Sequence, residues 1–134
     1  MKYFAISTSP EMLLKLASGE YSADLRTTYL HRWEEPIKVF LVNHKTGMVV
    51  AEYLFISAEK ARVDRYSPRK DYDGGYSIQE LADYSKGSRF FLWHFTDLLF
   101  YNKPFDQSKL VCERTGNTFC KKTIKAYVRF EQAV

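Results

Sequence analysis

Apolar residues are densest within residues 88–110, SRFFLWHFTDLLFYNKPFDQSKL, where the run from Phe90 to Phe95 is apolar at nearly every position. Because alternate side chains of a strand point to opposite faces of a sheet, both faces of this strand would be buried. The pattern therefore predicts a central strand. Asp97 interrupts the apolar run, which resumes at Leu98, so we expect one long strand that bends midway. We expect residues 102–104, Asn-Lys-Pro, to end it, since asparagine favours turns and proline cannot donate a ladder hydrogen bond.

Alternation of apolar and polar positions predicts further strands at residues 2–7, 21–27, 37–43, 48–56 and 124–130. Two helices complete the pattern. Ser9 is the expected N-cap of a helix that begins at Pro10 and stops near Gly19. A capping box at Ser77 begins a second helix over residues 76–87. This order of elements predicts a mostly β, α+β fold with two short helices and a small curled or closed sheet.

The chain has 134 residues, of which 46% are hydrophobic and 16% aromatic, and this is enough for one domain with a core. It contains no apolar run near the length of a membrane span, and its first residues lack the apolar region of a secretory signal. We expect a single cytoplasmic domain over residues 1–134, with no membrane partner. Residues 58–75 are heavily charged and close with two glycines, which predicts a mobile excursion.

Positive charge is concentrated at one end of the chain. Residues 1–108 contain 14 Lys or Arg and 14 Asp or Glu, so the last 26 residues carry the whole net charge of +4. A local excess of positive charge suits a polyanion such as RNA or DNA, although the solvated surface of a small basic protein has the same composition. The expected surface for contact with a nucleic-acid backbone consists of Lys121, Lys122, Lys125 and Arg129.

In the last predicted strand, Lys125, Tyr127 and Arg129 share one face, which places an aromatic ring between two basic groups. This combination suits backbone contact together with base stacking. Charges on an edge strand also prevent aggregation, and that role explains the same pattern without a ligand.

Two polar side chains share a face of the strand predicted at residues 21–27. Asp24 and Arg26 are two residues apart, so they can pair with each other or together hold a planar hydrogen-bonding ligand. Pairing is the commoner role for such residues. His44 and Lys45 lie in a predicted hairpin turn at a strand end, where binding groups are common, although a solvated turn is the default.

The sequence predicts no metal site and no cofactor. Cys112 and Cys120 form no CxxC motif, and no histidine follows residue 94, so the ligand spacing of a zinc site is missing.

Two segments resemble motifs of the ASCH domain of the PUA-like superfamily: GEYSADLR at residues 19–26 and YNKPFDQSKL at residues 101–110. The order of elements over residues 3–120 is similar as well. In that family a strand and a helix are followed by a G-x-K-x-x-x-x-R strand, paired strands, a helix and a long strand that ends in Tyr-x-x-Pro. The resemblance implies a small PUA-like β-barrel with a cleft near the first helix that binds RNA or a modified nucleobase.

The chain keeps Gly19 and Arg26 of this motif but has Tyr21 where the family has lysine, and Asp24 where an acid or a threonine is usual. Some relatives resemble small amidohydrolases that act on acylated cytidine, for which the lysine and a threonine three residues later are the catalytic pair. Because Tyr21 and Asp24 replace both, we expect no such reaction and assign no catalytic residue. A tyrosine phenol, with an ordinary pKa of about 10, is a poor nucleophile near neutral pH.

The first functional hypothesis is a non-catalytic module that binds RNA or a nucleotide, with DNA as an alternative ligand. Arg26 and Asp24 would read a base edge, because one offers a fork of donors and the other accepts from exocyclic amines. Ser9 at the helix start would contact a phosphate or a polar edge. The remaining residues expected around this cleft are Tyr21, Asn43, His44, Lys45 and Thr118.

The second hypothesis is a small hydrolase or ribonuclease that acts on RNA or a modified nucleoside. Asp24 and a histidine, His44 or His94, would serve as acid and base, with or without a metal. His94 lies within the apolar run, where a core histidine is more common than a catalytic one. A third hypothesis is a protein-interaction role for the charged residues 62–75.

Overall fold

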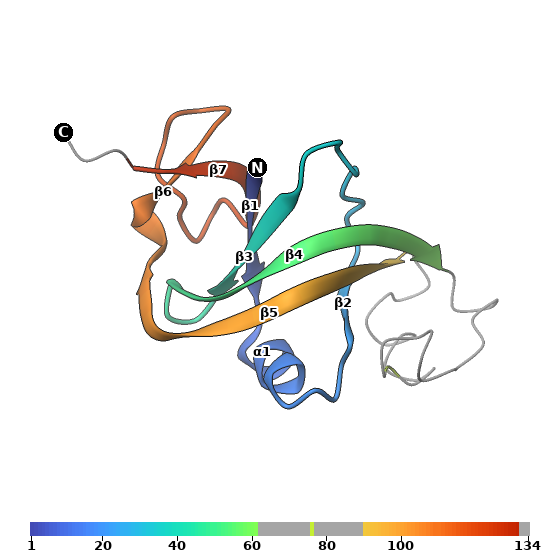
Figure 1. Ribbon diagram of the computed structural model, residues 1–134. Helices are drawn as coiled ribbons and strands as arrows, with labels where there is room; N and C mark the ends of the chain where they lie inside the picture. Colours follow the sequence, from blue (N-terminus) through green and yellow to red (C-terminus); the bar gives the residue numbers. More distant parts are fainter. Residues whose placement is uncertain (62–75, 77–89, 132–134) are drawn as a thin grey trace. The chain divides into compact units, whose positions relative to one another are not determined.

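The computed structural model describes residues 1–61, 76 and 90–131 (Figure 1). The helix predicted at residues 76–87 lies outside the described residues except for Tyr76. Of the excursion predicted at residues 58–75, only residues 58–61 are described, and they continue a strand. Among the described residues, no helix is long and apolar enough to cross a membrane.

Seven strands form one mixed sheet in the order β2-β5-β4-β3-β1-β7-β6, which confirms the mostly β prediction (Figure 1). The strands are β1 Lys2–Thr8, β2 Ala23–Arg26, β3 Ile37–Asn43, β4 Met48–Ala61, β5 Phe90–Asp106, β6 Leu110–Cys112 and β7 Lys125–Phe130. The helical elements of the described residues are α1 Pro10–Ala17 and the 3-10 helix η2 Gln107–Lys109. β1 runs parallel to β3 and antiparallel to β7.

The described strands do not form the closed barrel that the resemblance implied. Their hydrogen-bonded order begins at β2 and ends at β6, and these two strands are not paired with each other. β2, with four residues, pairs with β5 at one end, and β6, with three residues, pairs with β7 at the other. Closing a barrel requires the two end strands to hydrogen-bond with each other. An alternation pattern predicts that a strand exists but not which strand it pairs with, so the sequence could not test closure.

The described chain divides into two compact units, and the first consists of Met1–Leu14, Trp33–Leu54 and Asp97–Val134. In this unit the ladder between β1 and β3 runs from the pair Lys2 and Ile37 to the pair Thr8 and Asn43. A buried apolar cluster holds the unit together: Ala5, Phe40, Val42, Val49, Leu110, Cys112, Phe119 and Val128. Because Phe40 and Val42 are two residues apart on β3, the cluster lies on one face of the sheet.

The predicted hairpin turn joins β3 to β4 within the first unit. Asn43 Oδ1 accepts hydrogen bonds from the backbone N–H of Lys45 at 2.9 Å and of Thr46 at 3.4 Å. Gly47 has a φ of 72°, a left-handed conformation that glycine adopts without steric cost, and its N–H donates to the Asn43 carbonyl at 2.8 Å. These bonds fix the register with which the two strands leave the turn.

The second unit consists of Lys15–Arg32 and Phe55–Thr96. Its ladder pairs β2 with β5 in antiparallel register, from Ala23 opposite His94 to Arg26 opposite Phe91. Trp93 is fully buried, packs edge-on against Phe55 and donates its indole N–H to the Thr28 carbonyl at 3.0 Å.

β5 is longer than the central strand that the sequence predicted. Asp97 has a φ of 57°, a left-handed backbone conformation, but the strand continues through it from Phe90 to Asp106. The predicted end at Pro104 is wrong, since the strand continues to Asp106. β2 pairs only with residues 91–94 of β5, and proline is tolerated on a strand edge where no ladder bond is donated.

Candidate nucleic-acid interface

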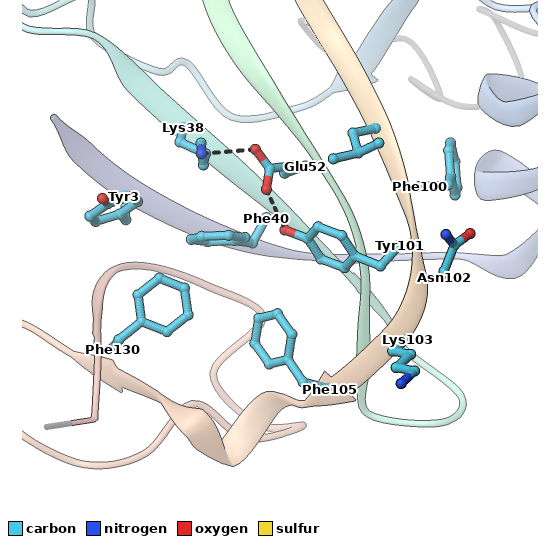
Figure 2. A pocket seen from close by; sticks show the side chains of 11 residues that line it. Tyr3, Lys38, Phe40, Glu52, Phe100, Tyr101, Asn102, Lys103, Phe105 and Phe130 are labelled. Carbon is cyan, nitrogen blue, oxygen red and sulfur yellow. Dashed lines mark hydrogen bonds and ion pairs between the residues drawn. The ribbon is translucent and has the colours of Figure 1, made fainter. Parts of the chain in front are cut away.

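The first unit contains an open cleft of about 490 Å³ on its sheet (Figure 2). We call it the aromatic cleft. Its aromatic lining includes Tyr3, Phe40, Tyr101, Phe105 and Phe130. Its polar lining consists of Lys38, Glu52, Asn102 and Lys103. These residues come from β1, β3, β4, β5 and β7, so the cleft depends on the order of the strands.

Phe40 is the buried centre of the aromatic lining, with 2% of its surface exposed. Its ring centroid lies 5.7 Å from that of Tyr3 in a stacked arrangement and 5.5 Å from that of Phe130 in an edge-on arrangement. Phe105 also lies edge-on to Phe40, at 6.4 Å. These are favourable geometries for aromatic pairs. Phe130 nevertheless remains 47% exposed, so part of its ring is accessible from solvent.

The polar lining is built around the carboxylate of Glu52. Lys38 Nζ lies 2.9 Å from Glu52 Oε2, and the Tyr101 hydroxyl donates a hydrogen bond of 2.8 Å to Glu52 Oε1 (Figure 2). The Lys38 and Glu52 side chains are 28% and 20% exposed, so solvent reaches the pair. A ligand in the cleft could therefore contact the carboxylate.

Burial raises the pKa of the Tyr101 phenol above its ordinary value, and the hydrogen bond to Glu52 and the charge of that carboxylate raise the pKa further. The phenol therefore stays protonated throughout the physiological range. In that state it donates to Glu52 and holds the carboxylate in a fixed position.

In the second unit, the two residues predicted to read a base edge are paired with each other. Arg26 Nε lies 3.0 Å from Asp24 Oδ1, and the two side chains are 9% and 0% exposed. The Arg26 guanidinium also lies 5.9 Å from the centroid of the Trp93 ring. The ion pair that the sequence allowed as one of two alternatives is therefore formed, and it is almost fully buried.

Tyr21 is buried close to the same strand. Its ring stacks on that of Tyr76 with 3.8 Å between centroids, and Lys15 Nζ donates to its hydroxyl at 2.9 Å. Tyr76 in turn is anchored on β2, because its hydroxyl donates to the Ala23 carbonyl at 3.0 Å and accepts from the Leu25 N–H at 3.2 Å. Tyr21 is thus held by packing and by hydrogen bonds within the second unit.

The other five predicted cleft residues lie in the first unit, and three of them, Ser9, Asn43 and His44, form hydrogen bonds with nearby backbone groups. Ser9 Oγ accepts from the Met12 N–H at 3.2 Å, which confirms the predicted N-cap. Asn43 caps the hairpin turn, as described above. The His44 N–H donates to the Thr8 carbonyl at 3.0 Å.

The side chains of His44, Lys45 and Thr118 are exposed, and Thr118 forms an isolated bridge with Val111. The described lining of the aromatic cleft does not include Ser9, Asn43, His44, Lys45 or Thr118.

The predicted basic surface is exposed on the first unit at all four positions: Lys121, Lys122, Lys125 and Arg129. Tyr127, between the two cations of β7, is half-buried. It packs edge-on against Phe4 at 5.1 Å, and its hydroxyl accepts from Trp33 Nε1 at 2.8 Å. The Trp33 ring is 44% exposed and has Lys2 Nζ at 4.5 Å from its centroid.

The acid and base of the hydrolase hypothesis are not brought together on β2 and β5. Asp24 pairs with Trp93 in the ladder, whereas His94 pairs with Ala23, so the Asp24 and His94 side chains lie on opposite faces. His94 Nε2 instead lies 3.0 Å from Glu59 Oε2. Over the described residues, no group of three or more His, Cys, Asp or Glu side chains could hold a metal ion.

The aromatic cleft was not predicted from the sequence, although part of its signal is visible there. Lys38 and Phe40 alternate on one strand face, and Tyr101, Lys103 and Phe105 do so on another. The pairing of these strands, which brings the residues together, depends on contacts between distant parts of the chain.

Comparison with solved structures identifies the fold. The crystal structure of ASCH from Zymomonas mobilis matches with a TM-score of 0.71 and 18% identity, covering 96% of this chain and 88% of that chain. A variant of ZmASCH with a serine replaced by alanine matches with a TM-score of 0.69, 19% identity and coverage of 96% and 89%. A variant of ZmASCH with a tyrosine replaced by phenylalanine matches with a TM-score of 0.71 and 18% identity, covering 96% of this chain and 91% of that chain. No family model and no curated protein matches the sequence. On this structural evidence, the chain has the ASCH fold.

Proposed function

We propose that this protein is a non-catalytic module that binds RNA through the aromatic cleft and the adjoining basic strand β7. One observation carries the proposal: the aromatic cleft is lined both by the exposed ring of Phe130 and by the exposed ammonium group of Lys103. A nucleotide whose base stacks on Phe130 could place its phosphate against Lys103, and neighbouring phosphates of the strand could contact the exposed cations of the C-terminal segment. Aromatic rings beside basic groups are the usual combination for binding single-stranded nucleic acid.

The charges of the C-terminal segment support the backbone contact. Lys121, Lys122 and Arg129 are exposed, and none of them forms an ion pair with another residue in the part of the chain that the structure describes. Lysine and arginine side chains of this kind can neutralise phosphates and release condensed counterions. Most of the affinity of this surface would therefore depend on salt.

The cleft residues predicted from the sequence, Ser9, Tyr21, Asp24, Arg26, Asn43, His44, Lys45 and Thr118, remain predicted contacts within this proposal. For Asp24 and Arg26, reading a base edge would require their enclosed ion pair to open, because both side chains are almost fully buried. Arg26→Ala tests this role. If Arg26 contacts a base, the variant loses affinity for some RNA sequences more than for others, whereas a loss of stability from breaking the ion pair lowers the affinity for all of them equally.

The proposal is tested by measuring the affinity of the purified protein for single-stranded RNA, structured RNA and duplex DNA across a salt series, with the RNA inspected afterwards for cleavage. We expect RNA binding that weakens steeply as the salt concentration rises, and intact RNA. Failure to bind any of the three would contradict RNA binding. Cleavage that disappears in Asp24→Asn would contradict the non-catalytic assignment and favour the ribonuclease hypothesis.

A further inference from the structure

The aromatic cleft has the size and surface to hold one planar ring system. Its volume of about 490 Å³ lies within the range typical of small-molecule sites. Phe130 is 47% exposed and meets the buried Phe40 edge-on, so the Phe130 ring offers area for stacking and Phe40 supports it. Stacking of this kind accepts any base, so selectivity must come from the polar lining.

Glu52 is the acceptor that can select among bases. An ionised carboxylate has about four acceptor positions, and Lys38 and Tyr101 each use one, on different oxygens. The remaining positions can accept N–H donors from a ligand, and the two protein donors hold the carboxylate in place before the ligand arrives. A carboxylate cannot donate, so it favours amino groups and repels carbonyl oxygens.

The charge of the cleft argues against the other ligand that aromatic pockets commonly hold, a quaternary or methylated ammonium ion. Lys38 and Lys103 line the cleft together with one carboxylate, Glu52, so a cationic ligand would meet two ammonium groups. An anionic ligand is attracted by the same charges, because the exposed Lys103 can contact a phosphate. The lining therefore suits a nucleotide.

We infer that the aromatic cleft selects a nucleotide whose base carries an exocyclic amino group, as cytosine, adenine and guanine do, over uracil, and that Glu52 makes the selection. The inference rests on the proposed RNA-binding function and specifies its base preference. Cytosine presents an amino donor where uracil presents a carbonyl oxygen, so the carboxylate accepts a hydrogen bond from the first and is repelled by the second.

The test compares fluorescently labelled homopolymers of rC and rU of equal length, because the two pyrimidines differ little in ring size. We expect the wild-type protein to bind rC about tenfold more tightly than rU, the ratio of one well-placed base contact. Equal affinity for rC and rU would overturn the inference.

Glu52→Gln tests whether the carboxylate is responsible. The amide keeps the shape of the side chain but adds two N–H donors that can bind the uracil carbonyl, so the rC to rU ratio should fall to about one. Glu59→Gln is the matched control, since Glu59 is a similarly exposed glutamate, paired with His94 in the second unit. It should keep the wild-type ratio. An unchanged ratio in Glu52→Gln would overturn the inference.

A second variant, Tyr101→Phe, keeps the carboxylate and removes the hydroxyl that positions it. The rC to rU ratio should lie between those of the wild type and Glu52→Gln, and a wild-type ratio would overturn the positioning role of Tyr101. The same titrations separate this inference from the proposed function. Tight, salt-dependent binding of rC and rU with equal affinity would contradict only the base preference. No binding of either homopolymer would contradict both.

Discussion

The two units each contain a carboxylate paired with a basic side chain, and the main difference between the two ion pairs is their exposure to solvent. Asp24 and Arg26 are 3.0 Å apart with side chains 0% and 9% exposed. Glu52 and Lys38 are 2.9 Å apart with side chains 20% and 28% exposed. The enclosed pair can only stabilise the fold while it stays closed, whereas the accessible pair keeps acceptor positions for a ligand.

The difference follows from the strands that carry the pairs. All four residues of β2 are buried, so both Asp24 and its neighbours lie inside the second unit. Lys38 and Glu52 lie on a sheet face that is open at the aromatic cleft. Breaking an enclosed pair leaves a buried charge and is costly, while breaking an exposed pair costs little.

The largest expected effect is therefore on stability. Asp24→Ala leaves the Arg26 guanidinium buried without its carboxylate, so we expect the free energy of unfolding to fall by about 3 to 5 kcal/mol. Glu52→Ala is the matched control at the accessible pair and should cost no more than about 1 kcal/mol. Guanidinium denaturation of both variants measures this, and equal losses would remove the distinction between the pairs.

The next effect is on RNA affinity. Phe130→Ala removes the exposed ring of the cleft, and we expect RNA binding to weaken by about 1 to 3 kcal/mol, the contribution of one stacked base. Ile56→Ala is a control, because Ile56 is 44% exposed, does not line the cleft and belongs to the second unit. Fluorescence anisotropy compares the two. Wild-type affinity in Phe130→Ala would show that the cleft does not hold a base.

A smaller effect is expected on the salt dependence. Replacing both Lys121 and Lys122 by alanine should reduce the slope of log K against log salt concentration by about 0.7 for each phosphate of single-stranded RNA that the protein no longer neutralises. Lys60→Ala removes an exposed lysine outside the C-terminal segment and should leave the slope unchanged. A slope that the double variant does not alter would place the phosphate-binding cations elsewhere.

The smallest effect concerns pH. Because the pKa of Tyr101 is raised in the folded state, the folded protein holds this proton more tightly than the unfolded chain. Its contribution to stability is full below the ordinary tyrosine pKa of about 10 and is lost as the pH rises above that value. Tyr101→Phe should therefore lose less stability than the wild type between neutral pH and about pH 11. Denaturation curves of both proteins at both pH values test this, and an equal loss of stability in the two proteins would contradict it.

Local patterns predicted the strands well where both hydrophobicity and turn chemistry were clear. The strand over Ile37–Asn43 and the turn that follows it have the predicted bounds, and Ser9 caps the predicted helix. The short strand β6 was not predicted, because three residues, Leu110–Cys112, are too few for an alternation pattern to be recognised. Its position depends on pairing with β7 rather than on its own sequence.

The candidate site was harder to predict, because it too depends on pairing between strands that are distant in the sequence. The spacing of Asp24 and Arg26 indicated that they share a strand face, but their enclosure depends on Trp93, far along the chain. The aromatic cleft joins side chains from five strands, and only the sheet order brings Lys38, Glu52 and Phe130 to one cleft. Long-range pairing of this kind leaves no pattern within any one segment.

The most direct test of the account is to map where bound RNA touches the protein, by ultraviolet cross-linking to a mixed-sequence single-stranded RNA followed by mass spectrometry. We predict cross-links to the aromatic cleft, at Tyr101, Phe105 or Phe130. Cross-links confined to residues 21–26, or RNA bound with none at the cleft, would contradict the assignment of the cleft as the site of base binding.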